Sequence, residues 1–139
     1  MATLPVILCD TNIFIEVYRN NADIIAALKK IGQPNIAISA VSAAELLFGA
    51  RTKTELAAIQ KDIKQLTLLH INEDISAMAL QLVDTFSLSH KLAIPDALIA
   101  ATALSHNLQL FTLNTKDFKF ITGRTPNEFA TKYPLSKLP

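Results

Sequence analysis

The stretch that decides the fold is Pro5-Val6-Ile7-Leu8-Cys9-Asp10-Thr11-Asn12, near the start of the chain. Its apolar run, residues 5–9, is typical of a short buried strand, and the polar residues that follow predict a turn at the end of that strand. A helical spacing of apolar residues begins directly afterwards, at Ile13. A buried strand that passes at once into a helix indicates the first unit of an alternating α/β protein.

The same alternation continues along the chain. Further strands are predicted at residues 35–39, 68–71 and 108–112, and helices at residues 13–19, 22–31, 41–48, 54–66, 74–89 and 95–106. Short strands joined by helices imply parallel crossovers, so we predict a three-layer α/β/α sandwich around a short, mostly parallel sheet. The length of 139 residues and the lack of a linker or repeat predict one domain over residues 1–139.

Composition narrows the class of protein. Half of the residues (50%) are hydrophobic, which suits a well-filled core and excludes a disordered chain. Lys and Arg number 13 against 12 acidic residues, so a protein that coats nucleic acid by bulk positive charge is excluded. The single cysteine, Cys9, can form neither an internal disulfide nor a cysteine-rich zinc site. With no signal peptide and no apolar run of the roughly 20 residues that span a bilayer, we expect a cytoplasmic protein without a membrane partner.

Polar residues follow each apolar run, where a parallel sheet carries its ligand site. The carboxyl ends of parallel strands meet at one edge, and ligands bind outside that edge. The residues predicted to lie there are Asp10, the segment 39–45 with Glu45, Asp96 on the apolar helix 95–106, and Asn114 and Asp117 after the last strand.

Each of these residues also has an ordinary structural interpretation. Asp10 has the place of a helix N-cap, and Ser42 with Glu45 has the form of a capping box. Asp96 suits the positive end of a helix dipole, and Asp117 suits a polar turn. Against these interpretations, the apolar neighbours of Glu45 and Asp96 predict that both carboxylates are desolvated, and that helix 95–106 is buried at its start.

Taken together, the acidic residues favour a metal site. Oxygen ligands suit Mg²⁺ or Mn²⁺, and repulsion within a group of carboxylates is relieved when a cation binds. Such a site activates water for in-line attack on a phosphodiester, without a protein nucleophile.

Four segments resemble one known family, the PIN domain, and within it the VapC-type toxins of bacterial and archaeal toxin–antitoxin pairs. The resemblance rests on Leu8–Asn12, Ser42–Gly49, Pro95–Ala103 and Leu110–Phe118, which occur in the family's order over residues 6–118. It implies an endoribonuclease dependent on Mg²⁺ or Mn²⁺, usually a homodimer, whose partners are an RNA substrate and a small inhibitory antitoxin.

The resemblance also implies roles for individual residues. Asp10, Glu45 and Asp96 match the family's three most regular acidic positions, which implies that Asp10 and Asp96 hold the metal while Glu45 binds it or orients the attacking water. The fourth position holds Asn114 in place of an acid. Whether Asn114, Asp117 or neither completes the site is open at this stage. Thr11 and Asn12 match a polar pair expected to bind the first acid or its water network.

Three alternatives remain beside the nuclease. A phospho-receiver domain has paired acids at its first strand, where this chain has one. A haloacid-dehalogenase phosphatase needs a second Asp where Asn12 stands. A catalytically silent PIN-like module that only binds RNA or a partner is favoured by Asn114. Structural or surface roles are the default for the remaining chemical groups, namely His70, His90 and His106, and the cations Arg51, Lys53, Lys91, Lys116, Lys119 and Arg124.

Overall fold

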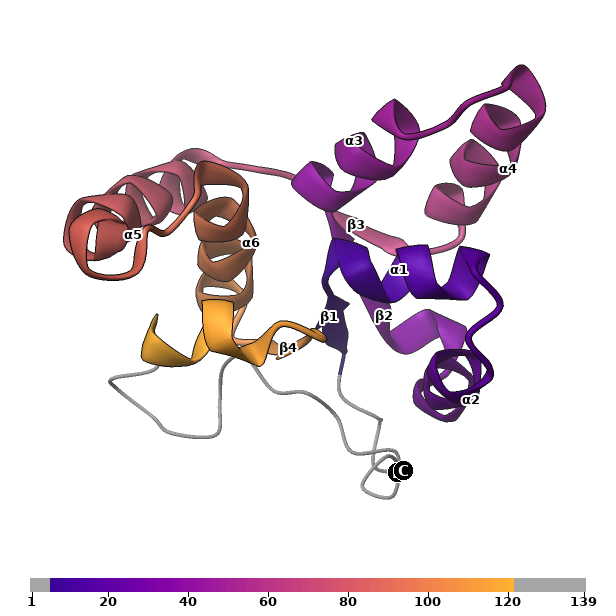
Figure 1. Cartoon of the computed structure of the whole chain (residues 1–139), viewed down its shortest axis with the longest axis horizontal. Helices are drawn as coiled ribbons and strands as arrows, with labels where there is room; N and C mark the ends of the chain where they lie inside the picture. The colour runs from indigo at the N-terminus through magenta and orange to yellow at the C-terminus, as the bar shows by residue number, and fades with distance from the viewer. Residues whose placement is uncertain (1–5, 122–139) are drawn as a thin grey trace.

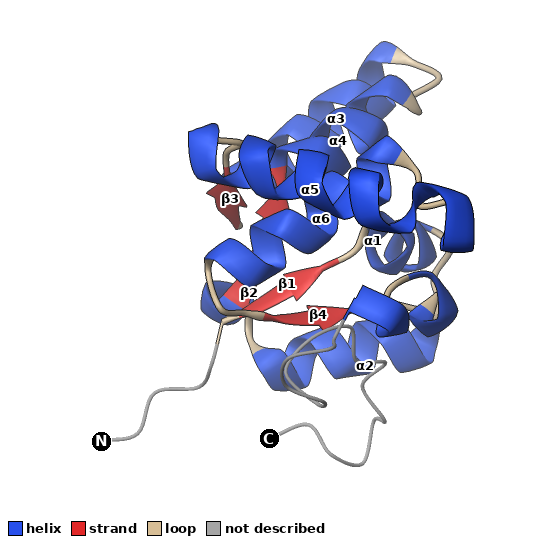
Figure 2. Cartoon of the chain, turned by 90° about the vertical axis from the view of Figure 1, so that its left-hand side faces the viewer, coloured by secondary structure: helices blue, strands red, loops and turns tan. Residues whose placement is uncertain are grey.

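The computed structural model describes residues 6–121, and its centre is a four-stranded parallel sheet in the order β3-β2-β1-β4. Residues 1–5 and 122–139, which include Arg124, lie outside this description. The strands are β1 (Ile7–Cys9), β2 (Ile36–Ser39), β3 (Thr67–Leu69) and β4 (Gln109–Phe111). Every neighbouring pair is parallel, with Ile7 opposite both Ile36 and Gln109. In Figure 2, β1 and β4 lie side by side and point the same way.

Helices connect the strands and cover both faces of the sheet. They are α1 (Thr11–Tyr18), α2 (Ala22–Ile31), α3 (Ala40–Phe48), α4 (Lys53–Lys64), α5 (Glu73–His90) and α6 (Ile94–Ser105), with short 3-10 helices at η1 (Gln33–Asn35), η2 (Thr115–Asp117) and η3 (Lys119–Ile121). In the described residues, every strand and helix predicted from the sequence is present, with ends that differ by no more than two residues. The predicted three-layer α/β/α sandwich is confirmed.

The alternation of side chains along each strand builds two separate cores. Ile7 and Cys9 of β1 pack with residues of α1, α2, α3 and α4, whereas Leu8 packs with residues of α5 and α6. Figure 1 shows the same division, with α5 and α6 on one side of the sheet and the first four helices on the other. Successive side chains of a strand point to opposite faces, so a fully apolar strand needs cover on both. No described helix has the length and apolar character needed to cross a membrane.

Short polar side chains begin most of the helices. Asp10, Asn21, Ser39, Thr52 and Asn72 are N-caps whose side chains accept backbone N–H groups of the first turn. α6 differs, because its N-cap makes no side-chain hydrogen bond and its first turn carries a proline and Asp96 instead. Caps therefore place the start of α1 directly after β1 and the start of α3 directly after β2, which brings both helix starts to the carboxyl edge of the sheet.

Candidate active site

The strand order places the candidate site at the carboxyl ends of β1 and β4. From β1 the chain moves to β2 and β3 on one side, and it returns to form β4 on the other side of β1. Open α/β sheets bind ligands where the strand order reverses in this way. The backbone N–H of Asp10 donates to Phe111 O at 2.9 Å across this reversal. The residues after Cys9 and those after Phe111 therefore start at the same edge.

Asp10 is held at this edge through both carboxylate oxygens. Oδ1 accepts from Thr11 N at 2.8 Å, so the capping interpretation is confirmed, and Oδ2 accepts from Thr112 Oγ1 at 2.8 Å. Burial raises the pKa of Asp10, the two hydrogen bonds act against this rise, and the charges of Glu45 and Asp117 add to it. The ionised carboxylate is only 5% exposed and lacks a described cation partner, which makes a bound cation favourable.

Asp96 approaches the same edge from α6. The prediction of a buried helix start is wrong, because Ile94 is 66% exposed and Asp96 is half-buried. The apolar run that follows is buried as predicted, while the first turn of α6 reaches the surface. Burial, and then the charges of Asp10, Asp117 and Glu45, raise the pKa of Asp96 to about 6. The carboxyl of Asp96 is therefore near its midpoint of ionisation under mildly acidic conditions.

Glu45 lies at the exposed rim of the site, on α3. The predicted desolvation of this residue is wrong, since Glu45 is exposed despite the apolar residues around it in sequence. Ala43 and Leu46 turn to the core at helical spacing, while Ala44 and Glu45 turn outward. The capping box with Ser42 is also wrong: Ser39 is the N-cap of α3, and its Oγ accepts from Ser42 N at 3.0 Å.

A hydroxyl pair links Glu45 to the inner residues. Thr11 Oγ1 lies 2.8 Å from Glu45 Oε1 and 2.8 Å from Ser42 Oγ. A hydroxyl has one proton to donate, and an ionised carboxylate can only accept. The Thr11 hydroxyl therefore donates its hydrogen bond to Glu45 and accepts a hydrogen bond from the Ser42 hydroxyl. Thr11 thus connects the two acids, because its backbone N–H donates to Asp10.

The segment after β4 brings Asn114 and Asp117 to the rim, and both are exposed. The backbone N–H of Asn114 donates to Thr112 Oγ1 at 3.0 Å, and within the described part of the chain the Asn114 side chain makes no hydrogen bond. The charge of Asp117, in η2, raises the pKa of both Asp10 and Asp96. Of the two residues that sequence left open, Asp117 is therefore the one whose side chain acts electrostatically on the site.

Thr112 is a site residue that the sequence interpretation missed. It is fully buried, and its hydroxyl donates to Asp10 while accepting the Asn114 N–H. Asn12 supports the same junction, because its Oδ1 accepts from Leu113 N at 3.4 Å. The available signal was a hydroxyl residue at the end of a buried apolar strand, since a buried hydroxyl requires a partner.

The remaining reactive groups lie outside this arrangement. His90 stacks on Phe120 with ring centroids 4.0 Å apart, and His70 and His106 are exposed. Cys9 is buried within β1, and burial raises the pKa of its thiol, which keeps it protonated and unreactive.

The acidic residues have the chemistry of a site for a hard divalent cation. Asp10, Glu45, Asp96 and Asp117 interact electrostatically, and all offer carboxylate oxygens, the donors that Mg²⁺ and Mn²⁺ prefer. Over residues 6–121, no three Asp, Glu, His or Cys side chains stand close enough together to chelate one ion as they are placed. The donor set fits such an ion by its chemistry, and Glu45 and Asp117 are exposed side chains with other rotamers open to them when an ion binds.

Comparisons with known proteins agree with this geometry. Residues 7–122 match the family model of the PIN domain. A chain of a toxin–antitoxin complex from Klebsiella pneumoniae is 31% identical, with a TM-score of 0.73 over 91% of this chain and 98% of that one. VapBC-1 from nontypeable Haemophilus influenzae contains a chain that is 27% identical, with a TM-score of 0.69 over 81% of this chain and 89% of that one.

FitAcB from Neisseria gonorrhoeae is similar at 25% identity, with a TM-score of 0.68 over 81% of this chain and 90% of that one. None of the curated proteins compared matches the chain. The family match covers nearly all described residues, including both strands and the helix that carry Asp10, Thr112 and Asp96. With the strand order and the acids at the carboxyl edge, it shows that this chain belongs to the PIN domain family, as a member of the VapC type.

Proposed function

We propose that this protein is the toxin of a VapBC-like toxin–antitoxin pair and acts in the cytoplasm as a metal-dependent endoribonuclease. The observation that carries the proposal is the group of four electrostatically coupled carboxylates, Asp10, Glu45, Asp96 and Asp117, at the reversal of strand order. Asp10 is buried and Asp96 is half-buried, and the pKa of each is raised. Carboxylates with pKa values raised by burial and by mutual repulsion are found where function requires them. Membership in the PIN family removes the phospho-receiver and haloacid-dehalogenase alternatives.

The residues that would hold a divalent ion are Asp10 and Asp96, with Glu45 as a further ligand or as the acceptor that orients the attacking water. Bound Mg²⁺ or Mn²⁺ supplies water activation and neutralises charge that develops on the cleaved phosphodiester. Asp117 stands at the rim, where its negative charge favours a bound cation.

The chain itself orients these acids. Thr112 and the Thr11 N–H hold one oxygen each of Asp10, so the inner carboxylate keeps one position. The Thr11 hydroxyl, on α1, donates a hydrogen bond to Glu45 on α3. Thr11 therefore contacts both acids, the inner carboxylate through its backbone N–H and the rim carboxylate through its hydroxyl.

Partner proteins are proposed on two grounds. The similar chains come from complexes described as toxin–antitoxin or VapBC assemblies, which supports a small antitoxin partner for this chain. Phe48 of α3 is 93% exposed and Ile94 of α6 is 66% exposed, each within three residues of a site acid. Large exposed apolar side chains mark contact surfaces, and we propose that the surface around Phe48 forms a homodimer interface. Light scattering of wild type and of Phe48→Asp would test it, since a dimer that uses this surface dissociates in the variant.

The test of the function is RNA cleavage by the purified protein, freed of any antitoxin. We expect cleavage with Mg²⁺ or Mn²⁺, none with EDTA, and none in Asp10→Asn or Asp96→Asn although both variants fold. Asp84→Asn is the matched control, because Asp84 is an exposed acid on α5. Cleavage retained in both site variants, or unaffected by EDTA, would contradict the proposal.

A catalytically silent PIN-like protein that binds RNA or a partner is the second candidate. It is favoured by Asn114 at the position where the family usually has an acid, and by the distance between the carboxylates as they are placed. Calorimetric titration with Mn²⁺ separates the two candidates, because the nuclease requires an ion to bind and the silent protein predicts no binding heat.

A further inference from the structure

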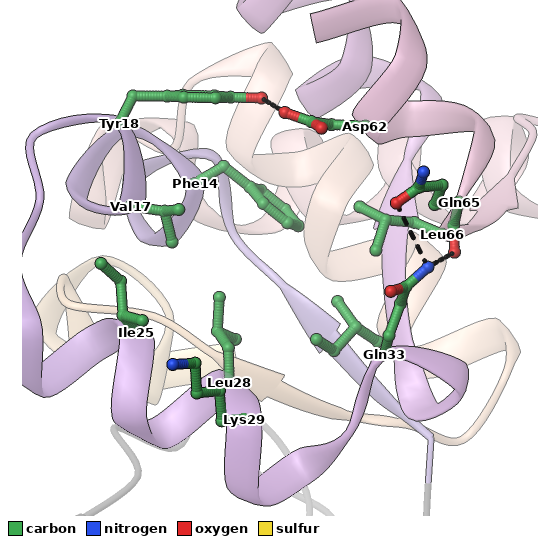
Figure 3. Close-up of a pocket in the computed structure, with 11 residues that line it drawn as sticks. Phe14, Val17, Tyr18, Ile25, Leu28, Lys29, Gln33, Asp62, Gln65 and Leu66 are labelled. Atoms are coloured by element: carbon green, nitrogen blue, oxygen red, sulfur yellow. Dashed lines mark hydrogen bonds between the residues drawn. The ribbon is translucent and has the colours of Figure 1, made fainter. Parts of the chain in front are cut away.

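Two cavities lie next to each other on the face covered by α1 to α4, with Tyr18 lining both. The α2 cavity, of about 330 Å³, lies between α1, α2 and the end of α4 and includes Phe14, Leu28, Lys29 and Gln65. Figure 3 shows it with the hydroxyl of Tyr18 bonded to Asp62 along one side. The α3 groove, of about 480 Å³, lies between α1, α3 and α4. Since the Tyr18 hydroxyl donates to Asp62 Oδ2 at 2.8 Å, its ring is a fixed wall between the two.

The α3 groove is continuous with the candidate active site, and the α2 cavity is not. Glu45 lines the groove, and the same carboxylate accepts from Thr11 and acts on the pKa of Asp10 and Asp96. A substrate strand that passes the acids at Glu45 therefore enters the groove next. The α2 cavity has no site acid among its lining residues.

The groove carries two guanidinium groups, Arg19 and Arg51. Arg19 Nη1 lies 3.8 Å from Glu16 Oε1, and the Arg19 side chain of this long ion pair is 72% exposed. Arg51 forms no ion pair within residues 6–121. Glu55, in the first turn of α4, also lines the groove, and its Oε2 accepts the backbone N–H of Arg51 at 2.7 Å, while its carboxylate forms no ion pair with the Arg51 guanidinium. Both guanidinium groups are thus available to an anionic ligand.

The rest of the groove is apolar. Leu46 and Ile59 are buried along it, and Ile15 and Tyr18 expose 38% and 45% of their surface. Nucleic-acid bases stack on apolar and aromatic side chains, while phosphates are bound by arginine. A volume of about 480 Å³ lies in the roughly 300–1,000 Å³ range of small-ligand sites. An apolar wall beside arginines matches a nucleotide, which presents a flat base and a phosphate together.

We propose that the α3 groove is a subsite for single-stranded RNA, which binds the nucleotide next to the cleaved phosphodiester. Arg51 and Arg19 hold its phosphate, and the base lies against Ile15, Leu46 and the ring of Tyr18. This subsite rests on the proposed ribonuclease function, because Glu45 connects it to the acids. Because the arginines contact a phosphate, this part of the affinity for RNA does not depend on the RNA sequence.

The experiment measures binding directly, so that it stands apart from catalysis. A fluorescently labelled single-stranded RNA hexanucleotide is titrated with the full chain in Ca²⁺, a larger divalent ion that takes oxygen ligands without the strict geometry of Mg²⁺. Anisotropy gives the Kd at several salt concentrations for wild type, Arg51→Ala and Arg51→Lys. Lys29→Ala is the matched control, because Lys29 is an exposed cation that lines the α2 cavity instead.

We expect Arg51→Ala to weaken binding about tenfold and to lower the slope of log Kd against log salt by about 0.7, the value for one phosphate contact on a single strand. Arg51→Lys keeps most of the slope, and Lys29→Ala matches wild type. If Arg51→Ala has the Kd and the salt slope of the wild type, the RNA subsite is contradicted and a protein partner becomes the occupant of the groove. A wild-type protein that does not bind the RNA contradicts the subsite in the same way. A wild type that binds with the expected slope but cleaves no RNA in Mg²⁺ contradicts the proposed function alone.

Discussion

The inner and outer parts of the candidate site carry similar side chains in different surroundings. The inner part, Asp10 with Thr112, is buried and bonded on both carboxylate oxygens. The rim, Glu45 with Asn114 and Asp117, is exposed, and only Glu45 among these has a described side-chain hydrogen bond. Burial gives the inner carboxylate one position and a raised pKa, whereas exposure leaves the rim free to move. The inner part therefore sets where a cation binds, and the rim adapts to what binds there.

The largest effect separates the two parts by activity. Asp10→Asn is expected to lower kcat for RNA cleavage by about 10³-fold or more, because it removes the buried charge without changing the side chain's shape. Asp117→Asn removes an exposed charge of the rim and is expected to cost about tenfold or less. Single-turnover cleavage of one RNA by both variants gives the ratio. Equal losses would show that burial does not distinguish the two carboxylates.

The second effect compares two threonines that hold the acids. Thr112→Val keeps the shape but removes the donor to Asp10 and the acceptor of the Asn114 N–H, and an unpaired buried group costs about 1–3 kcal/mol of the free energy of unfolding. Thr11→Val removes one hydrogen bond to the exposed Glu45 and one to the buried Ser42, and it is expected to cost less than Thr112→Val because one of its two partners is exposed to solvent. Urea denaturation of both variants measures the difference. A Thr11→Val loss as large as that of Thr112→Val would mean that the rim is as rigid as the inner part.

The third effect is a pH dependence of stability from Asp96. The pKa of Asp96 in the folded protein is about 6, above its ordinary value of 3.8, so the folded state binds the proton more tightly than the unfolded state does. The protonated carboxyl of Asp96 therefore stabilises the folded state below about pH 4, and this stabilisation is lost as the pH rises through 6. Without divalent metal, Asp96→Asn should therefore be more stable than wild type at pH 7, by about 1 kcal/mol after allowing for solvent around the half-buried group. Denaturation at pH 4 and pH 7 tests the sign, and a larger gain at pH 4 would contradict it.

The smallest effect concerns Asn114. Its described hydrogen bond uses the backbone N–H, and its side chain is exposed, so Asn114→Ala is expected to leave cleavage within about twofold of wild type. A comparison of the loss of cleavage in Asn114→Ala with the loss in Asp117→Asn shows which of the two residues belongs to the active site. A loss in Asn114→Ala larger than that in Asp117→Asn would assign the place to Asn114.

The sequence was most informative where local patterns suffice. Asp10 follows a short apolar strand and begins a helix, and both facts are readable from neighbouring residues. Its cap to Thr11 N is a contact between adjacent residues, so it was predicted and is present. The same reasoning placed Glu45 and Asp96 on helices at the carboxyl edge of the sheet.

Sequence patterns failed where exposure depends on packing from elsewhere. Glu45 has apolar neighbours in sequence, but α3 turns only some of them, such as Ala43 and Leu46, to the core and turns the carboxylate to solvent. The first turn of α6 is equally apolar, yet Ile94 lies at the surface because no described element covers it. Thr112 was missed because its partner, Asp10, is 102 positions away in the chain.

By itself, the sequence determined the parallel three-layer architecture, the strands and helices, and the acids at the carboxyl edge, because strand and helix periodicity and N-caps are local properties. Only the tertiary structure decided which of those acids is buried and which is exposed, that Thr112 and Thr11 hold them, and that a groove with Arg19 and Arg51 opens beside Glu45. These depend on β1, β4, α1 and α3 meeting at one edge, and desolvation and charge coupling arise only when distant segments come into contact.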